Sequence, residues 1–126
     1  MPSVDDPFFR LLCVEDNLPF QQMLKLALGM YGFEVVTASH GYDALMQYKA
    51  NKGRFGAILT DHDMPHVNGL ELVRSIRELG YKGRIILMSG RLTADELQKY
   101  APYAINGFFH KPFDVGMLAA MLLQAD

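Results

Sequence analysis

Short apolar segments alternate with longer, mixed segments along the chain. Five of the apolar segments have the length of a β-strand, and several are nearly continuous in apolar residues, at 10–14, 34–38, 55–60, 84–89 and 105–109. Such strands are typical of a parallel sheet that is covered on both faces. The longer segments between them predict helices at 18–30, 42–50, 69–79, 93–100 and 115–124.

Capping residues support these helix boundaries. Asn17 stands where a residue can cap the first helix, with Pro19 in its first turn. Asp95 and Glu96 fall in the first turn of the fourth helix, where the helix dipole favours anions, and Asp114 can cap the fifth helix.

Five strand–helix units in regular alternation predict an α/β fold with right-handed crossovers. We therefore expect a doubly wound, five-stranded parallel sheet flanked by five helices. Residues 1–126 are expected to form a single domain with a core at about 10–124, which fits a chain of this length. Ligands of such sheets bind beyond the carboxyl ends of the strands.

The residues that follow the predicted strands suit phosphoryl chemistry. Glu15 and Asp16 follow the first strand, Asp61 the third, Ser89 ends the fourth and Lys111 follows the fifth. Carboxylates brought together repel one another, and a hard divalent cation such as Mg²⁺ or Mn²⁺ relieves that repulsion. A lysine and a hydroxyl beside them can bind an anion, and a carboxylate can attack phosphorus.

Composition and charge exclude several other classes of protein. The net charge of −2, without a basic cluster, gives no reason to expect direct contact with nucleic acid. The amino-terminal stretch lacks the pattern of a signal peptide, and VGMLAAMLL is too short to cross a membrane. Cys13 is interpreted as a small buried hydrophobe. We expect a cytoplasmic protein.

Four motifs resemble those of a known family. LLCVEDN, LTDHDMPHVNG, ILMSG and FFHKPF stand in the order and at the spacing of the response-regulator receiver domain. This is the CheY-like, flavodoxin-like domain of two-component and phosphorelay signalling. The resemblance implies a signalling phosphoacceptor rather than a turnover enzyme.

The resemblance also implies roles for particular residues. Asp61 would accept a phosphoryl group from the phosphohistidine of a histidine kinase or phosphotransfer protein. Mg²⁺ would be held by the side chains of Glu15, Asp16 and Asp61 and by the backbone carbonyl of Asp63, with Glu15 acting directly or through water.

The other implied roles concern the switch. Ser89 would bond a phosphoryl oxygen, Lys111 would pair with the phosphoryl group or with Asp61, and Phe108 occupies the aromatic switch position. The Lys111–Pro112 bond matches a junction that is often cis in the family. An output domain or partner would bind the face formed by the fourth helix, fifth strand and fifth helix.

Two sets of residues leave alternatives open. His62 and His66 have ligand-type side chains, but their positions vary in the family, and we interpret them as solvated loop histidines. Asp63 and Arg91 flank the phosphorylation pocket, so an ion pair between them is expected to modulate the lifetime of the phosphoryl group. The alternative is two separately solvated side chains.

The fifth helix carries no charge, from Val115 to Leu123. Leu118, Ala119 and Leu122 fit a core-facing stripe, which leaves Met117, Ala120 and Met121 facing outward. We expect this face to bind a partner or a second copy of the chain, the alternative being apolar residues tolerated in water.

Two other functions remain open at the level of sequence. A phosphohydrolase of the haloacid-dehalogenase type also uses an Asp nucleophile in a D-x-D motif, but there the motif follows the first strand. A receiver fold could also serve as a scaffold that is never phosphorylated, although the complete acidic, serine and lysine set argues against this.

Overall fold

The structure is a computed structural model that describes residues 6–124. Residues 1–5 and 125–126 of the predicted domain lie outside this description. The prediction that the chain has no signal peptide rests on residues 1–10, and half of these lie outside the described residues. Within the described residues, no helix is long and apolar enough to cross a membrane.

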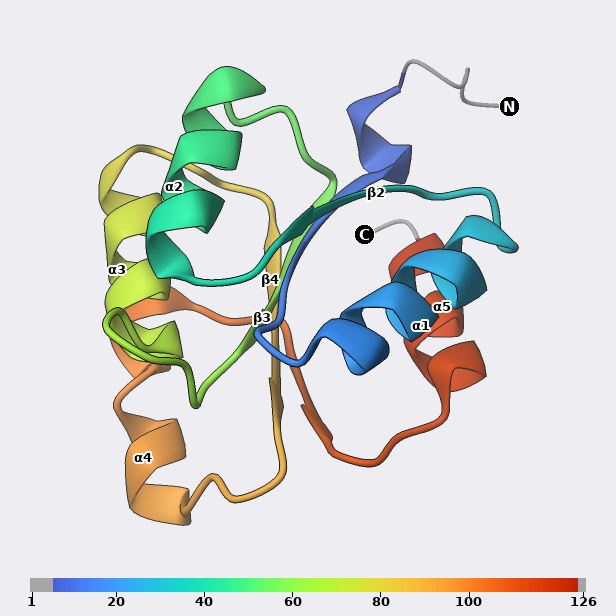
Figure 1. Cartoon of the computed structure of the whole chain (residues 1–126). Helices are drawn as coiled ribbons and strands as arrows, with labels where there is room; N and C mark the ends of the chain where they lie inside the picture. Colours follow the sequence, from blue (N-terminus) through green and yellow to red (C-terminus); the bar gives the residue numbers. More distant parts are fainter. Residues whose placement is uncertain (1–5, 125–126) are drawn as a thin grey trace.

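The strands form one parallel sheet in the order β2-β1-β3-β4-β5 (Figure 1). This order confirms the predicted doubly wound architecture, with its switch point beside β1. The strands are β1 (Arg10–Val14), β2 (Glu34–Ala38), β3 (Ala57–Asp61), β4 (Arg84–Ser89) and β5 (Gly107–His110). A short 3₁₀ turn, η1 (Pro7–Phe9), precedes β1.

The helices cover both faces of the sheet. One face carries α1 and α5, and the other carries α2, α3 and α4 (Figure 1). Their bounds are α1 (Leu18–Gly29), α2 (Gly41–Ala50), α3 (Gly69–Glu78), α4 (Ala94–Gln98) and α5 (Val115–Leu123).

The sheet separates two apolar cores, because successive side chains of a strand point to opposite faces. In β1, Leu12 and Val14 pack with the residues of α2 and α3, whereas Leu11 and Cys13 pack with those of α1 and α5. Cys13 is fully buried, as predicted, and burial raises the pKa of its thiol to about 12. All residues of β3 are buried, which explains why it begins with three apolar residues, Ala57, Ile58 and Leu59.

The predicted caps are confirmed. Asn17 and Asp114 accept main-chain N–H bonds at the starts of α1 and α5. Thr93 and Glu96 form a reciprocal capping box at the start of α4. The Lys111–Pro112 bond is cis, as expected.

The predicted helix at 93–100 is too long. The α-helix ends at Gln98 and the chain continues into a second 3₁₀ turn, η2 (Ala101–Tyr103). Pro102 in this turn has no N–H to donate to a continued helix. Ala104 then takes a left-handed conformation with φ of 53°. A left-handed alanine costs about 1–2 kcal/mol.

Candidate functional site

The acidic residues predicted to meet at one edge of the sheet do so. Glu15 directly follows β1, and Asp61 is the last residue of β3, the neighbouring strand. One carboxylate oxygen each from Glu15, Asp16 and Asp61 lie within 4.8 Å of one another. Glu15 and Asp61 are buried, whereas Asp16 is exposed. The site therefore has a buried floor and one acidic side chain in contact with solvent.

Lys111 connects the two buried carboxylates. Its ammonium donates to Oδ2 of Asp61 at 3.0 Å and to Oε1 of Glu15, and it also lies 4.7 Å from the ring centroid of Phe20. Burial alone would lower the pKa of Lys111, but the hydrogen bonds and charges of Glu15 and Asp61 outweigh it and raise the pKa above its ordinary value. The lysine is therefore charged at neutral pH.

Glu15 is fixed by its surroundings. Its Oε2 accepts the main-chain N–H of Asn17 at 3.0 Å. Burial raises the pKa of this carboxyl, although the hydrogen bonds from Lys111 and Asn17 act in the opposite direction. Gln21, which sequence reasoning missed, is buried and donates to the carbonyls of Glu15 and Ala38. This amide holds the loop after β1 against the end of β2.

The remaining predicted residues lie on or directly after the neighbouring strands β3, β4 and β5. Ser89 is fully buried at the end of β4, and its Oγ accepts the main-chain N–H of Arg91 at 3.1 Å. The main-chain N–H of Asp63 donates to Oδ1 of Asp61 at 3.3 Å. Phe108 is half-buried on β5 and lines a hollow of about 380 Å³ between α4, η2 and β5.

Asp63 and Arg91 are both exposed, and the ion pairs found within residues 6–124 do not join them. Their predicted pairing stays a prediction.

The interpretation of His62 as a solvated loop histidine is wrong. His62 is only 8% exposed and bonds two side chains, the hydroxyl of Tyr100 and the carboxylate of Glu96. The sequence hides this because the two partners are 38 and 34 residues away. His66 is exposed, as expected for a loop histidine, and His40 caps α2.

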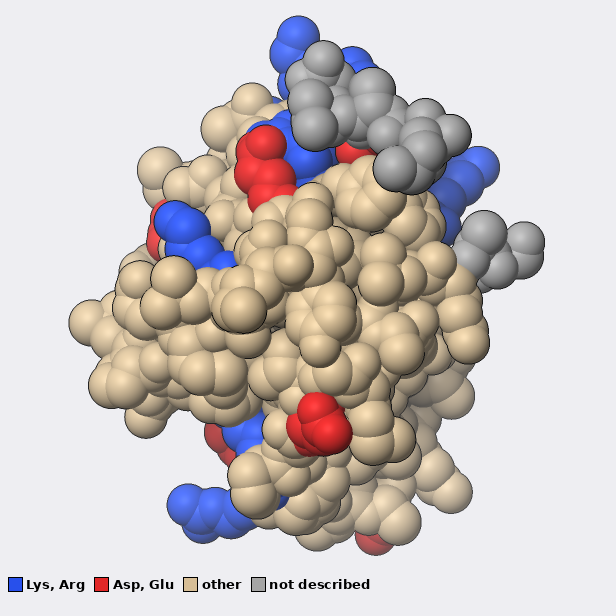
Figure 2. Space-filling model, turned by 90° about the vertical axis from the view of Figure 1, so that its right-hand side faces the viewer, with Lys and Arg blue, Asp and Glu red and all other residues tan. Residues whose placement is uncertain are grey.

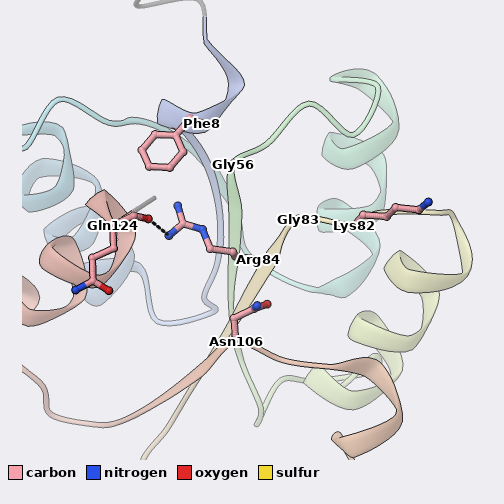
Figure 3. A pocket seen from close by; sticks show the side chains of 7 residues that line it. All are labelled: Phe8, Gly56, Lys82, Gly83, Arg84, Asn106 and Gln124. Atoms are coloured by element: carbon pink, nitrogen blue, oxygen red, sulfur yellow. Dashed lines mark hydrogen bonds between the residues drawn. The ribbon is translucent and has the colours of Figure 1, made fainter. Parts of the chain in front are cut away.

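A second hollow, of about 270 Å³, lies at the opposite edge of the sheet (Figure 3). Arg84 donates there to the last carbonyls of α5 and stacks on the ring of Phe8. Figure 3 shows Lys82 extending away from these groups. The basic groups do not converge, so we interpret this hollow as the packing of the carboxyl end of α5.

A doubly wound sheet with three carboxylates, a lysine and a buried serine at one edge defines a phosphoacceptor domain. The chain belongs to the family of the response regulator receiver domain, whose model matches residues 11–123. This domain is therefore a signalling phosphoacceptor of the two-component type rather than a catalytic enzyme, as the sequence predicts.

Individual relatives agree with this assignment. The chain is 25% identical to two-component response regulator 24 of Arabidopsis thaliana, over 97% of this chain and 87% of that protein. It is 33% identical to the virulence sensor protein BvgS of Bordetella bronchiseptica, over 98% of this chain but only 10% of that protein. It also spans less than half the length of two further relatives.

Among solved structures, the chemotaxis protein CheY4 of Vibrio cholerae superimposes with a TM-score of 0.80. The two sequences are 30% identical, and the match covers 90% of this chain and 94% of the other.

Proposed function

We propose that Asp61 accepts a phosphoryl group from the phosphohistidine of a histidine kinase or phosphotransfer protein. We also propose that residues 1–126 form a single receiver domain with a core at about 10–124. One observation carries the first proposal: the carboxylate of Asp61 is bonded to Lys111 and lies within 4.8 Å of Glu15 and Asp16. This arrangement combines a nucleophile, Asp61, with the positive charge of Lys111, which can bind a phosphoryl group.

The transfer balances without a further reactant. An oxygen of the Asp61 carboxylate attacks phosphorus, the P–N bond to the donor histidine breaks, and an acyl phosphate forms. The bonding pair stays on the imidazole nitrogen, and the ring leaves as neutral imidazole because its other nitrogen carries a proton in the reacting form. Lys111 offsets the negative charge that arrives, and the hydroxyl of Ser89 donates to a phosphoryl oxygen.

The donor set fits Mg²⁺ or Mn²⁺. It would consist of the side chains of Glu15, Asp16 and Asp61 with the backbone carbonyl of Asp63, and oxygen ligands favour a hard cation. The bound ion would neutralise charge on the phosphoryl oxygens. Because Lys111 already pairs with two of these carboxylates, it and the ion would share the task of balancing their charge.

The phosphorylated form would act through the face made by α4, β5 and α5. Ser89 would move toward the phosphoryl group and Phe108 would turn inward, which biases a two-state equilibrium. The partner is an output domain, another protein or a second copy of the chain. We expect these steps to take place in the cytoplasm, without direct contact with nucleic acid.

The apolar surface of α5 supports a docking role. Leu118, Ala119 and Leu122 are buried, as predicted, while Met117 is 66% exposed. Met121 faces outward less than predicted, because its side chain packs over Gly107. Unexpectedly, the neighbouring α1 also exposes large apolar residues, and Figure 2 shows that the face formed by α1 and α5 carries few charged side chains.

Labelling with a small phosphodonor tests the phosphoacceptor. The protein is incubated with acetyl phosphate and Mg²⁺, and its mass is measured with and without a chelator. We expect one phosphoryl group per chain, none after Asp61→Asn, and none with the chelator. Asp43→Asn, at an aspartate on α2, is the matched control and should label normally.

Two outcomes would contradict the proposal. Absence of labelling in the presence of Mg²⁺ would indicate a scaffold that works without phosphorylation. Labelling that persists in Asp61→Asn would place the acceptor elsewhere.

A further inference from the structure

His62 lies between the acceptor Asp61 and the predicted metal ligand Asp63, and its main chain is held on both sides. Its N–H donates to the carbonyl of Met88 at 3.1 Å, and its carbonyl accepts the N–H of Gly69 at 2.9 Å. The backbone next to the acceptor is therefore fixed to β4 and to the start of α3. The side chain of His62 therefore extends from a backbone position that is held by hydrogen bonds on both sides.

This side chain bonds one residue within α4 and one that follows it. Nδ1 lies 2.5 Å from the hydroxyl of Tyr100, which follows the helix, and Nε2 lies 3.1 Å from Oε2 of Glu96, in its first turn. Figure 1 shows α4 at the edge of the molecule. His62 thus connects the loop of the acceptor to this short helix and to the residue that follows it.

Glu96 links this contact to the loop after Ser89. Its other oxygen, Oε1, accepts from the main-chain N–H and the hydroxyl of Thr93, which caps α4. Only residues 90–92 separate Ser89 from Thr93. A movement of Ser89 toward a phosphoryl group would therefore pull on the carboxylate that binds His62.

Tyr100 links the same contact to the hollow beside Phe108. Its ring is fully buried. A Cβ atom at Gly69 would lie 2.8 Å from the hydroxyl of Tyr100, so the absence of a side chain at Gly69 provides the space for this hydroxyl. Tyr100 and Phe108 both line the hollow of about 380 Å³ between α4 and β5. One side chain therefore reaches from the acceptor loop to the expected switch.

We propose that His62 is a positioning residue that holds α4 in its resting position through Tyr100 and Glu96. The hydrogen bonds of His62 stabilise the unphosphorylated arrangement, and switching requires that they be given up. A contact made only in the resting state lowers the population of the switched state. This inference rests on the proposed function.

The test uses Tyr100→Phe, which removes the hydroxyl and keeps the buried ring. The amide NMR shifts of Gly90 and Gly107 are measured without ligand and at saturation with beryllofluoride and Mg²⁺, a mimic of the phosphoryl group. We expect the shifts of the ligand-free variant to move toward the saturated position. The equilibrium constant for switching should rise about threefold to tenfold, the factor that corresponds to one hydrogen bond.

Tyr103→Phe is the matched control, because Tyr103 is a half-buried tyrosine on η2 whose hydroxyl makes none of the hydrogen bonds found within residues 6–124. It should reproduce the wild-type shifts. Wild-type shifts in Tyr100→Phe, or equal displacements in the two variants, would overturn the inference. A wild-type protein that does not respond to beryllofluoride would instead overturn the proposed function.

A second pair of variants covers the case in which Tyr100→Phe does not fold. Glu96→Ala removes both the bond to His62 and the capping box, whereas Thr93→Ala removes the cap and leaves the bond to His62. We expect the ligand-free shifts of Glu96→Ala to lie closer to the saturated position than those of Thr93→Ala. Equal displacements would overturn the inference.

Discussion

The ammonium of Lys111 lies 3.0 Å from Oδ2 of Asp61 and also donates to the buried Glu15. Replacing this lysine with methionine leaves two buried carboxylates without their counter-ion. We expect Lys111→Met to lower the free energy of unfolding by about 1–3 kcal/mol, because an uncompensated buried charge is costly. Urea unfolding without divalent ions measures this change.

Mg²⁺ should partly restore the stability of Lys111→Met, and should stabilise the variant more than the wild type. Lys99→Met is the control, at an exposed lysine that takes part in none of the ion pairs within residues 6–124. An unchanged stability of Lys111→Met would mean that the carboxylates do not depend on the lysine.

Gly69 should not tolerate a side chain. A Cβ atom there would lie 2.6 Å from the carbonyl oxygen of Asp61 and 2.8 Å from Cα of His62, both of them main-chain atoms. We expect Gly69→Ala to cost about 1–3 kcal/mol in the free energy of unfolding. Gly29→Ala, where nothing lies within 4 Å, should be neutral or stabilise by less than about 1 kcal/mol. Thermal or urea unfolding of both variants compares the two sites.

The predicted ion pair between Asp63 and Arg91 should affect the lifetime of the phosphoryl group. If the pair partly covers the acceptor, Arg91→Ala should shorten the lifetime of the phosphoryl group, by no more than about fivefold because exposed pairs are weak. Loss of the phosphoryl group after removal of the donor measures this lifetime. Arg74→Ala, at an exposed arginine of α3 that pairs with Glu78, is the control. An unchanged lifetime contradicts the prediction.

The carboxyl of Glu96 should titrate below the usual range. Hydrogen bonds from the main chain of Thr93 and then from His62 lower its pKa. The stability that these bonds contribute is present above the ordinary pKa of glutamate and is lost as the pH falls through the lowered pKa. NMR titration of the Glu96 side chain should show this low midpoint, and Thr93→Gly should raise it. A midpoint in the usual range would mean that these bonds do not form in solution.

The two sides of α5 should respond differently to substitution. Leu118→Ala removes a fully buried side chain and should cost about 2–5 kcal/mol, whereas Met117→Gln should change the free energy of unfolding by less than about 0.5 kcal/mol. Met117→Gln should nevertheless weaken association through this face, measured by sedimentation velocity with beryllofluoride present. A wild-type protein that stays monomeric at high concentration would contradict self-association.

Most of the fold could be predicted because its signals are local. The strands, the caps of α1 and α5 and the acidic first turn of α4 depend on residues within a few positions of one another, and they are confirmed. The earlier end of α4 at Gln98 could not be predicted from apolar spacing, which does not distinguish an α-helix from the 3₁₀ turn η2 that soon follows it.

The acidic cluster could also be predicted, since parallel strands bring their carboxyl ends to one edge. The surroundings of His62 could not. A histidine in a polar loop gives no sign that it is buried, and its partners lie on α4, far along the chain. The role of Gln21 could not be predicted either. It is a polar residue of the helix α1, and its side chain donates to the carbonyl of Glu15 in the loop after β1.

The sequence by itself determined the order of the elements, the edge of the sheet that carries the chemistry, and the residues Glu15, Asp16, Asp61, Ser89 and Lys111. These follow from apolar periodicity and from the rule that governs parallel sheets. Only the tertiary structure decided that Lys111 joins Glu15 to Asp61, and that His62 joins the acceptor loop to α4. Such contacts depend on how separate elements pack, and that packing fixes side-chain distances of a few ångströms that no local pattern encodes.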